Sequence, residues 1–437
     1  MFATWMLGAV WVPTNFRLTP PEAAYLAMSS GASVHIFDDA FPEHAAAAKA
    51  ENPACRLEIA IPDGWDALAA GPDRMARPAD VDRDHAAWFF YTSGTTGRPK
   101  AGVLTHGQLN YVVCNHLCDL MPATTERDVS LVVAPLSHGA GIHALPQIAR
   151  GAASVLMPGE RLDVAEAWRL VERHRVTNLF TVPTLLTMLT RHDQVDRRDH
   201  SSLRYVIYAG APMYRADQKH AQEKLGPVLV QYFGMGEVTG NITVLPPSCH
   251  SLNDADMPVG SCGFPRTGME IAILDEAGAH LPPDTTGEIC VRGPGVFAGY
   301  HANPDATAAA TRHGWFHTGD LGHVDARGFV YITGRASDMY ISGGSNVYPR
   351  EIEEVLLTHP AVAEACVVGM PHEKWGETGV AVLVLRAGVS AAALAAFVDG
   401  KLARYKHPGS YVFWPELPKS GYGKVVKRDV KQRLEIS

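Results

Sequence analysis

A run of hydroxyl-bearing and glycine residues lies between an apolar stretch and a lysine, in the segment YTSGTTGRPK. The hydroxyls can donate hydrogen bonds, the glycines let backbone N–H groups curl around an anion, and the lysine adds positive charge. The segment therefore predicts a loop that binds a polyphosphate. It is not a Walker A loop, because Arg98 and Pro99 separate the last glycine from the lysine. The candidate residues are Thr92, Ser93, Gly94, Thr95, Thr96, Gly97 and Lys100.

Two acidic residues lie in glycine-rich segments further along the chain. Glu237, in QYFGMGE, suits a magnesium ion that keeps most of its ligands from phosphates and water. Asp320, in GWFHTGD, can accept hydrogen bonds from a ribose diol. Taken alone, Asp320 fits a carboxylate that caps a turn equally well.

The type of secondary structure expected around these residues changes along the chain. From Ala86 to about Tyr208, short apolar runs alternate with helical periods, which predicts a layered α/β region with a mostly parallel sheet. From Pro258 to Arg335, short strands separated by Gly, Pro and Asp predict a small antiparallel or barrel-like subdomain. We therefore expect an α/β protein with a large domain, residues 1–337, followed by a small α+β domain, residues 338–437.

Composition narrows the class of protein. With 437 residues, of which 46% are hydrophobic and 19% charged, the chain is typical of a folded enzyme of two or three domains. Its formal net charge of −8 gives no bias toward nucleic acid or an anionic membrane. The seven cysteines are an odd, scattered set, which predicts reduced thiols and a cytoplasmic protein. The apolar start has no basic residue before Arg17 and is interrupted by Pro13, so we expect neither a signal peptide nor a membrane span.

The motifs resemble those of the AMP-forming superfamily of acyl- and aryl-CoA synthetases, luciferases and peptide-synthetase adenylation domains. After TSGTTGRPK, the matching segments follow in the family's order: GEICVRGPGVFAGY, GWFHTGD, GRASDMYISGGSNVYPREIEE, WGE, LARYKHP and LPKSGYGKVVKR. The resemblance covers essentially the whole chain. It implies an acid:CoA ligase that uses ATP, Mg²⁺ and coenzyme A: a small carboxylic acid and ATP give an acyl-adenylate and pyrophosphate, and the CoA thiol then displaces AMP.

The resemblance also implies residue roles. Lys424 would hold the acid's oxygen against the α-phosphate, and Glu237 would be the metal-associated glutamate. Asp320 and Arg335 would bind the ribose, and Asp338 would be the hinge of the small domain. The adenine would be framed by Gly210, Ala211, Pro212, Gln231, Phe233 and Gly234. The pantetheine arm would pass Gly343 and Gly344, and the acid pocket would include His138, Gly139 and Tyr208. A buried structural histidine is an equal alternative for His138.

The chain departs from the family pattern at four places, one of which, Ala101 in place of a glycine after the loop lysine, should have a mild effect. Phe233 replaces a tyrosine, and Gly236 replaces a threonine whose hydroxyl faces the α-phosphate. Losing a bond to a charged group commonly costs about 1.5 to 3 kcal/mol, unless a water fills the space at Gly236. Relatives also carry several dozen residues before the segment that resembles MLGAVWVPTNFRLTP, so we expect the large domain to lack its first part.

These departures keep two alternatives open. One is a stand-alone adenylation enzyme that loads the thiol of a separate carrier protein, and the other is a truncated or degenerate nucleotide-binding relative without catalysis. Aromatic, medium-chain and longer fatty acids all remain candidate substrates, because one methylene changes the free energy of binding by only about 1 to 3 kcal/mol.

Overall fold

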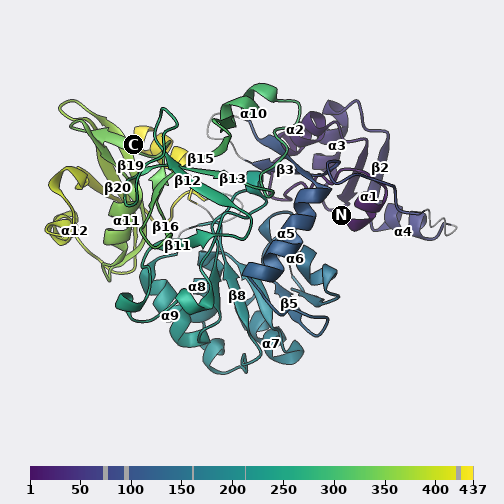
Figure 1. Cartoon of the computed structure of the whole chain (residues 1–437), viewed down its shortest axis with the longest axis horizontal. Coiled ribbons are helices and arrows are strands. Elements are labelled where there is room, and N and C mark those ends of the chain that lie inside the picture. Colours follow the sequence, from purple (N-terminus) through teal and green to yellow (C-terminus); the bar gives the residue numbers. More distant parts are fainter. Residues whose placement is uncertain (72–76, 93–97, 160–161, 212, 420–424, 437) are drawn as a thin grey trace.

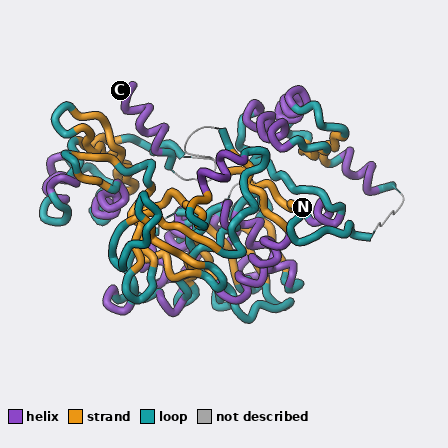
Figure 2. Tube along the Cα trace, turned by 45° about the horizontal axis from the view of Figure 1, so that its top comes forward, coloured by secondary structure: helices purple, strands orange, loops and turns teal. Residues whose placement is uncertain are grey.

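The computed structural model describes residues 1–71, 77–92, 98–159, 162–211, 213–419 and 425–436. Central sheets form the main body, an N-terminal group of helices and strands lies at one side, and the C-terminal region lies at the opposite side (Figure 1). The same arrangement is visible after a 45° rotation (Figure 2). No described helix combines the length and apolar character needed to cross a membrane.

The N-terminal group is built on a two-stranded parallel sheet of β1 (Val34–Asp38) and β2 (Leu57–Ile61). A capping box starts one of its helices, because the Thr19 backbone N–H donates to Glu22 Oε2 at 2.7 Å. Its helices are α1 (Phe2–Met6), α2 (Pro20–Ser30), α3 (Pro42–Glu51) and α4 (Asp63–Ala69).

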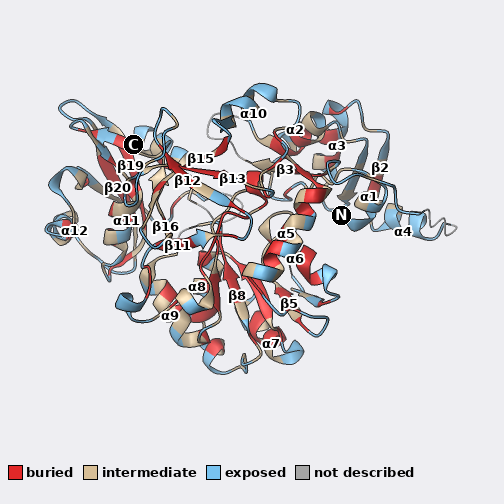
Figure 3. Cartoon of the chain, viewed as in Figure 1, coloured by how far each residue is buried: buried red, intermediate tan, exposed pale blue. Residues whose placement is uncertain are grey.

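A five-stranded parallel sheet forms the centre of the main body. Its strand order is β6, β5, β7, β8, β9, and every neighbouring pair is parallel, which confirms the predicted layered α/β region. The strands are β5 (Val129–Val132), β6 (Ala153–Leu156), β7 (Asn178–Thr181), β8 (Tyr205–Tyr208) and β9 (Leu229–Gln231). The helices of this part of the chain are α5 (His106–Asp119), α6 (Gly139–Ala149), α7 (Val164–His174), α8 (Pro183–Arg191) and α9 (Arg215–Leu225). Buried residues follow β5 and β8 (Figure 3).

A hairpin of β3 (Ala86–Thr92) and β4 (Lys100–Thr105) precedes this sheet. Trp88 and Phe90 of β3 enter a large hydrophobic core that also contains residues of the antiparallel sheet. Register pairs Thr92 with Lys100, so the predicted phosphate loop connects the ends of the two strands.

The predicted antiparallel subdomain is confirmed as a seven-stranded sheet, with β14 paired to β15 at its side. Its strands are β10 (Thr243–Val244), β11 (Ser261–Pro265), β12 (Glu270–Leu274), β13 (Gly287–Arg292), β14 (Thr311–Arg312), β15 (Trp315–Val324) and β16 (Val330–Arg335). Helix α10 (Pro304–Ala310) lies between β13 and β14 in the sequence.

The C-terminal region has a sheet and a hydrophobic core of its own. That core contains Tyr340, Ile352, Val367, Leu383 and Leu394, among others. Its strands are β17 (Tyr340–Ser342), β18 (Ser345–Val347), β19 (Val362–His372), β20 (Gly376–Leu385) and β21 (Ser410–Phe413). Its helices are α11 (Pro349–Leu357), α12 (Ala391–Val398) and α13 (Lys427–Ile436). The large and small α/β parts of the predicted fold class are thus confirmed, while the boundary at 337/338 stays a prediction.

Short 3₁₀ turns connect several of these elements. They are η1 (Asp193–Asp196), η2 (Gly236–Val238), η3 (Pro247–Cys249), η4 (Asp254–Asp256) and η5 (Arg404–Lys406).

Candidate active site

Glu237 is a buried carboxylate on η2, only 5% exposed. Its Oε1 accepts a hydrogen bond from Thr92 Oγ1 at 2.7 Å and another from the Tyr300 hydroxyl at 3.0 Å. Burial, reinforced by the negative charge of Glu237, raises the pKa of Tyr300, so this hydroxyl remains a donor at neutral pH. Three segments far apart in sequence therefore meet at one carboxylate.

Strand β3 brings Thr92, the first residue of the predicted phosphate loop, to this carboxylate. Thr92 ends β3 at Glu237, and Lys100 begins β4 with its Nζ 5.2 Å from the centre of the Tyr300 ring. The residues between them that were assigned to the phosphate loop lie outside the described part of the chain. The predicted site residues outside the described part of the chain are Ser93, Gly94, Thr95, Thr96, Gly97, Pro212 and Lys424.

The surroundings of Glu237 fit a magnesium ion. Among the described residues, the one cluster of three or more His, Cys, Asp or Glu ligand atoms lies elsewhere, at Glu288, Cys290 and His317. Glu237 thus offers a single protein carboxylate, held in place by two hydroxyl groups. This donor set suits Mg²⁺, which commonly binds one or two carboxylates and takes its other ligands from phosphates and water.

Gly236, the residue before Glu237, has no free space beside it. An added Cβ would lie 2.5 Å from Phe90 Cδ1 and 2.9 Å from Thr92 Cγ2. The aromatic ring of Phe90 therefore occupies the volume that the sequence had left open for a water. Nothing local marks Phe90 in the sequence beyond its place in an apolar strand, so its relation to Gly236 appears only in the folded chain.

Asp320 and Arg335 form an ion pair across β15 and β16. They are register partners, and Arg335 Nε donates to Asp320 Oδ1 at 3.1 Å. The Asp320 side chain is 7% exposed and the Arg335 side chain 39%. The pair thus joins an anchored carboxylate to a guanidinium that faces solvent, and the structure brings together the two residues assigned to the ribose.

The residues assigned to the adenine follow the carboxyl ends of β8 and β9, the edge at which parallel sheets commonly bind ligands. Gly210 has a φ of +85°, which favours glycine, and Ala211 follows it in the turn after β8. A Cβ on Gly234 would lie 2.2 Å from the Gly240 carbonyl oxygen, so two backbone segments meet there too closely for a side chain. The neighbouring Phe233 carbonyl accepts hydrogen bonds from the backbone N–H groups of Ile242 and Thr243.

Tyr208, assigned to the acid pocket, is fully buried in the core of the parallel sheet. Its hydroxyl donates to Gln231 Oε1 at 3.1 Å and accepts from Gln218 Nε2 at 2.8 Å. It also lies 3.0 Å from His250 Nε2. In this structure Tyr208 therefore holds Gln231, a residue assigned to the adenine, and any influence on the acid acts through its neighbours.

Aromatic rings surround the start of α6. His138 immediately precedes this helix, and its ring centre lies 4.9 Å from that of Phe90. A Cβ on Gly139 would lie 2.8 Å from Phe180 Cζ. Phe180 in turn stacks on Tyr232, with ring centres 6.0 Å apart. Both residues assigned to the acid pocket on this helix thus contact phenylalanine rings.

The residues assigned to the hinge and the thiol path lie in two turns. The Asp338 backbone N–H donates to the Arg335 carbonyl in the connection from β16 to β17. Gly343 and Gly344 have φ of +56° and +82° in the two-residue turn between β17 and β18. Trp375 packs on this turn, because a Cβ on Gly343 would lie 3.2 Å from its ring.

Fold and site together define an α/β enzyme whose predicted adenine-binding residues lie at the edge of a parallel sheet. Residues 1–301 match the family model described as AMP-binding enzyme, and residues 351–424 match the one described as AMP-binding enzyme C-terminal domain. The chain therefore belongs to the AMP-binding enzyme family, the AMP-forming adenylate-forming enzymes.

Named relatives cover almost the whole chain. It is 39% identical over 440 residues to the feruloyl-CoA synthase of an Amycolatopsis species, covering 99% of this chain and 86% of that protein. It is 35% identical over 442 residues to the indoleacetate–CoA ligase of Aromatoleum aromaticum, covering 99% and 85%. The O-succinylbenzoate coenzyme A synthetase of Bacillus subtilis, solved with ATP and a magnesium ion, has a TM-score of 0.85 and 32% identity, covering 98% and 86%. The predictions of an AMP-forming acid:CoA ligase and of ATP, Mg²⁺ and CoA as its cofactors are confirmed.

Proposed function

We propose that this ligase activates a carboxylic acid that carries a planar ring. Two features support this class of substrate. The relatives described above are named for feruloyl, indoleacetate and succinylbenzoate, all of which contain an aromatic ring. The rings of Phe90 and Phe180 line His138 and Gly139, and a flat ring packs well against such walls.

The observation that carries adenylation at this site is the buried Glu237 carboxylate, held by Thr92 and Tyr300 at the base of the phosphate loop. We assign Glu237 to Mg²⁺, Lys100 to the phosphates, and Lys424 to the acid oxygen and α-phosphate as pyrophosphate leaves. Asp320 and Arg335 bind the ribose, and the turns at Gly210 and Gln231 receive the adenine.

The second step follows a rotation of residues 338–437 about Asp338, which brings the Gly343–Gly344 turn to the acyl-adenylate. The CoA thiol then attacks the acyl carbon and AMP leaves. A carrier-protein thiol is the second candidate acceptor, and both acceptors present the same pantetheine arm. We place the reaction in the cytoplasm, in keeping with seven cysteines that form no disulfide.

The test is pyrophosphate release with ATP and Mg²⁺ across ring-bearing acids and across medium- and long-chain fatty acids, each with and without CoA. We expect turnover to AMP and a thioester with ring-bearing acids, and a large loss in Glu237→Gln and Lys424→Ala. The matched control is Glu270→Gln, an exposed glutamate that pairs with Arg292. A clear preference for fatty acids would refute the proposed substrate class. Pyrophosphate release without thioester would favour a carrier protein.

A further inference from the structure

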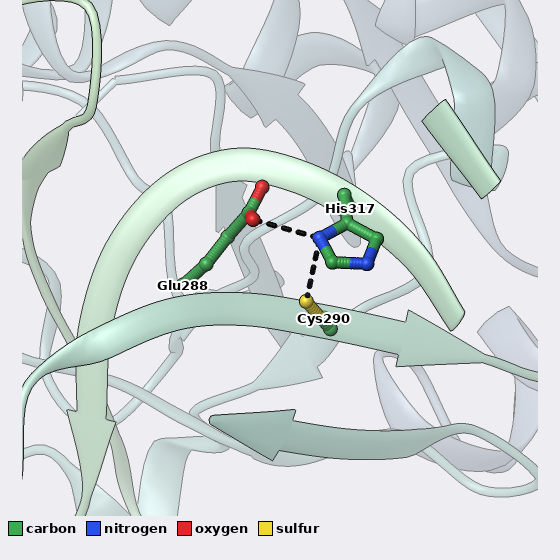
Figure 4. Close-up of side chains that lie close together, drawn as sticks. All are labelled: Glu288, Cys290 and His317. Carbon is green, nitrogen blue, oxygen red and sulfur yellow. Dashed lines mark hydrogen bonds and ion pairs between the residues drawn. The ribbon is translucent and has the colours of Figure 1, made fainter. Parts of the chain in front are cut away.

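Glu288, Cys290 and His317 form a compact cluster on the antiparallel sheet, outside the residues assigned to the nucleotide. Their ligand atoms all lie within 4.8 Å of one another. His317 Nδ1 is 2.7 Å from Glu288 Oε2 and 3.3 Å from Cys290 Sγ. Figure 4 shows the three side chains pointing toward one another from two neighbouring strands.

Local backbone geometry creates this convergence. Glu288 and Cys290 are two residues apart on β13, so their side chains lie on the same face of the strand. Cys290 pairs directly with His317 of β15, and the register shifts between Glu288 and Cys290. This irregularity allows both side chains of β13 to reach one ring nitrogen.

The cluster does not have the geometry of a cysteine nucleophile with its base. In such a triad the two imidazole nitrogens serve different partners, whereas here Nδ1 contacts both the thiol and the carboxylate. Burial also raises the pKa of the Cys290 thiol to about 12.

We propose that Glu288, Cys290 and His317 form a binding site for a thiophilic divalent transition metal of the Zn²⁺ type. One sulfur, one imidazole nitrogen and one carboxylate oxygen are the donors that zinc takes in proteins, with a fourth position left for water. Tetrahedral bond lengths separate such donors by roughly 3.4 to 3.6 Å. The Sγ to Nδ1 distance is close to this, and Glu288, with a side chain 23% exposed, has room to withdraw slightly.

Two neighbouring groups bear on the strength of this site. His317 Nε2 is buried and has no hydrogen-bond partner in the described part of the chain. Metal binding at Nδ1 moves the ring proton to Nε2, where this N–H is buried without an acceptor among the described residues, so the site should bind more weakly than one whose second nitrogen is hydrogen-bonded. A cation also occupies this position in the structure, since Arg312 places its guanidinium 3.1 Å from Nδ1 and 3.6 Å from Glu288 Oε2. Its side chain is 53% exposed, so it can swing into solvent when a metal binds.

The test uses Co²⁺, whose visible and thiolate charge-transfer absorption reports its ligands, with Zn²⁺ as competitor. The protein is first treated with a chelator and carries Cys114→Ser and Cys118→Ser. These two exposed thiols lie one helical turn apart on α5 and would bind metal themselves. We expect one Co²⁺ per chain with a thiolate band, and displacement of that Co²⁺ by Zn²⁺.

Variants in this background decide the outcome. Cys290→Ser should abolish the band, and Glu288→Gln should weaken Co²⁺ binding roughly tenfold or more. Cys262→Ser, the matched control at another buried thiol, should retain the band. Arg312→Ala should strengthen binding, because it removes the competing cation, and a variant that fails to fold cannot produce such a gain. The proposal is overturned if the thiolate band is absent from both the background protein and Arg312→Ala. It is also overturned if the band survives in Cys290→Ser.

Discussion

The ring of Phe90 fills the position that a side chain at residue 236 would otherwise occupy. A Cβ built on Gly236 would lie 2.5 Å from Phe90 Cδ1 and 2.8 Å from Phe90 Cε1. Contacts this short do not occur between real side chains, so Phe90 and Gly236 form a complementary pair. The loss of the family's threonine at 236 is thus matched by a large ring from the neighbouring strand.

Restoring the threonine alone should therefore damage the protein. We expect Gly236→Thr to lower the free energy of unfolding by about 1 to 3 kcal/mol, because it overpacks a site that Phe90 already fills. Gly388→Thr is the matched control, since nothing lies within 4 Å of a Cβ added at Gly388. Urea unfolding of both variants measures the difference.

The double variant tests whether the two positions are coupled. Phe90→Ala removes the clashing ring, so Gly236→Thr should cost less in that background than in the wild type. A double-mutant cycle in the free energy of unfolding and in kcat/KM for ATP should show this as non-additivity. Additive effects would mean that Phe90 and Gly236 act independently.

Tyr300→Phe should impair adenylation without unfolding the protein. It removes one of the two hydroxyls bonded to Glu237, and a bond to a charged group is worth about 1.5 to 3 kcal/mol, or roughly a tenfold to hundredfold fall in kcat/KM for Mg·ATP. The effect should persist across neutral pH, because burial and Glu237 raise the pKa of Tyr300. Tyr331→Phe is the control, since that hydroxyl bonds Asp325 away from Glu237. Equal activity of the two variants would show that Tyr300 does not support Glu237.

The sequence predicted those features of this protein that depend on local patterns of residues. Alternating strands and helices predicted the parallel sheet. Motifs that the family shares assigned Asp320 and Arg335 to one ligand, while their ion pair is a finding of the structure. Phe90 and Tyr300 were missed, because each meets Gly236 or Glu237 only after distant segments fold together. The cluster at Cys290 was missed for the same reason, since its residues lie in two separate motifs joined by strand register.

Acid should destabilise this fold through its buried histidines. Burial lowers the pKa of His143 and of His250 to about 4, and that of His116 well below its ordinary value. As pH falls from about 6.5 toward 4, the unfolded chain binds protons at these residues and the native protein does not, so stability falls. Each histidine contributes a slope of up to about 1.4 kcal/mol per pH unit, and above pH 6.5 their contribution vanishes.

Urea unfolding between pH 7.5 and 4.5 measures this slope. His143 donates from Nε2 to Asn178 Oδ1, and His143→Gln keeps a donor there without a group that titrates. Below pH 6.5, we expect the free energy of unfolding of this variant to fall less steeply with decreasing pH, by the contribution of one histidine. An unchanged slope would mean that His143 is protonated in the native protein or remains neutral in the unfolded chain.

Arg335→Gln should separate nucleotide binding from stability. The Arg335 side of the ion pair with Asp320 is partly exposed, and glutamine keeps an N–H group that can donate to the buried Asp320 carboxylate, so we expect only a small fall in the unfolding midpoint. If Arg335 and Asp320 bind the ribose, the KM for ATP should rise roughly tenfold or more, because one bond from a charged donor is lost. Arg327→Gln, which breaks the exposed pair with Asp325, is the matched control and should leave the KM for ATP unchanged.

Measuring pyrophosphate release and thioester formation separately shows which half-reaction uses Arg335. A variant with normal KM for ATP but slow thioester formation would move the role of Arg335 from the ribose to the connection that leads to Asp338.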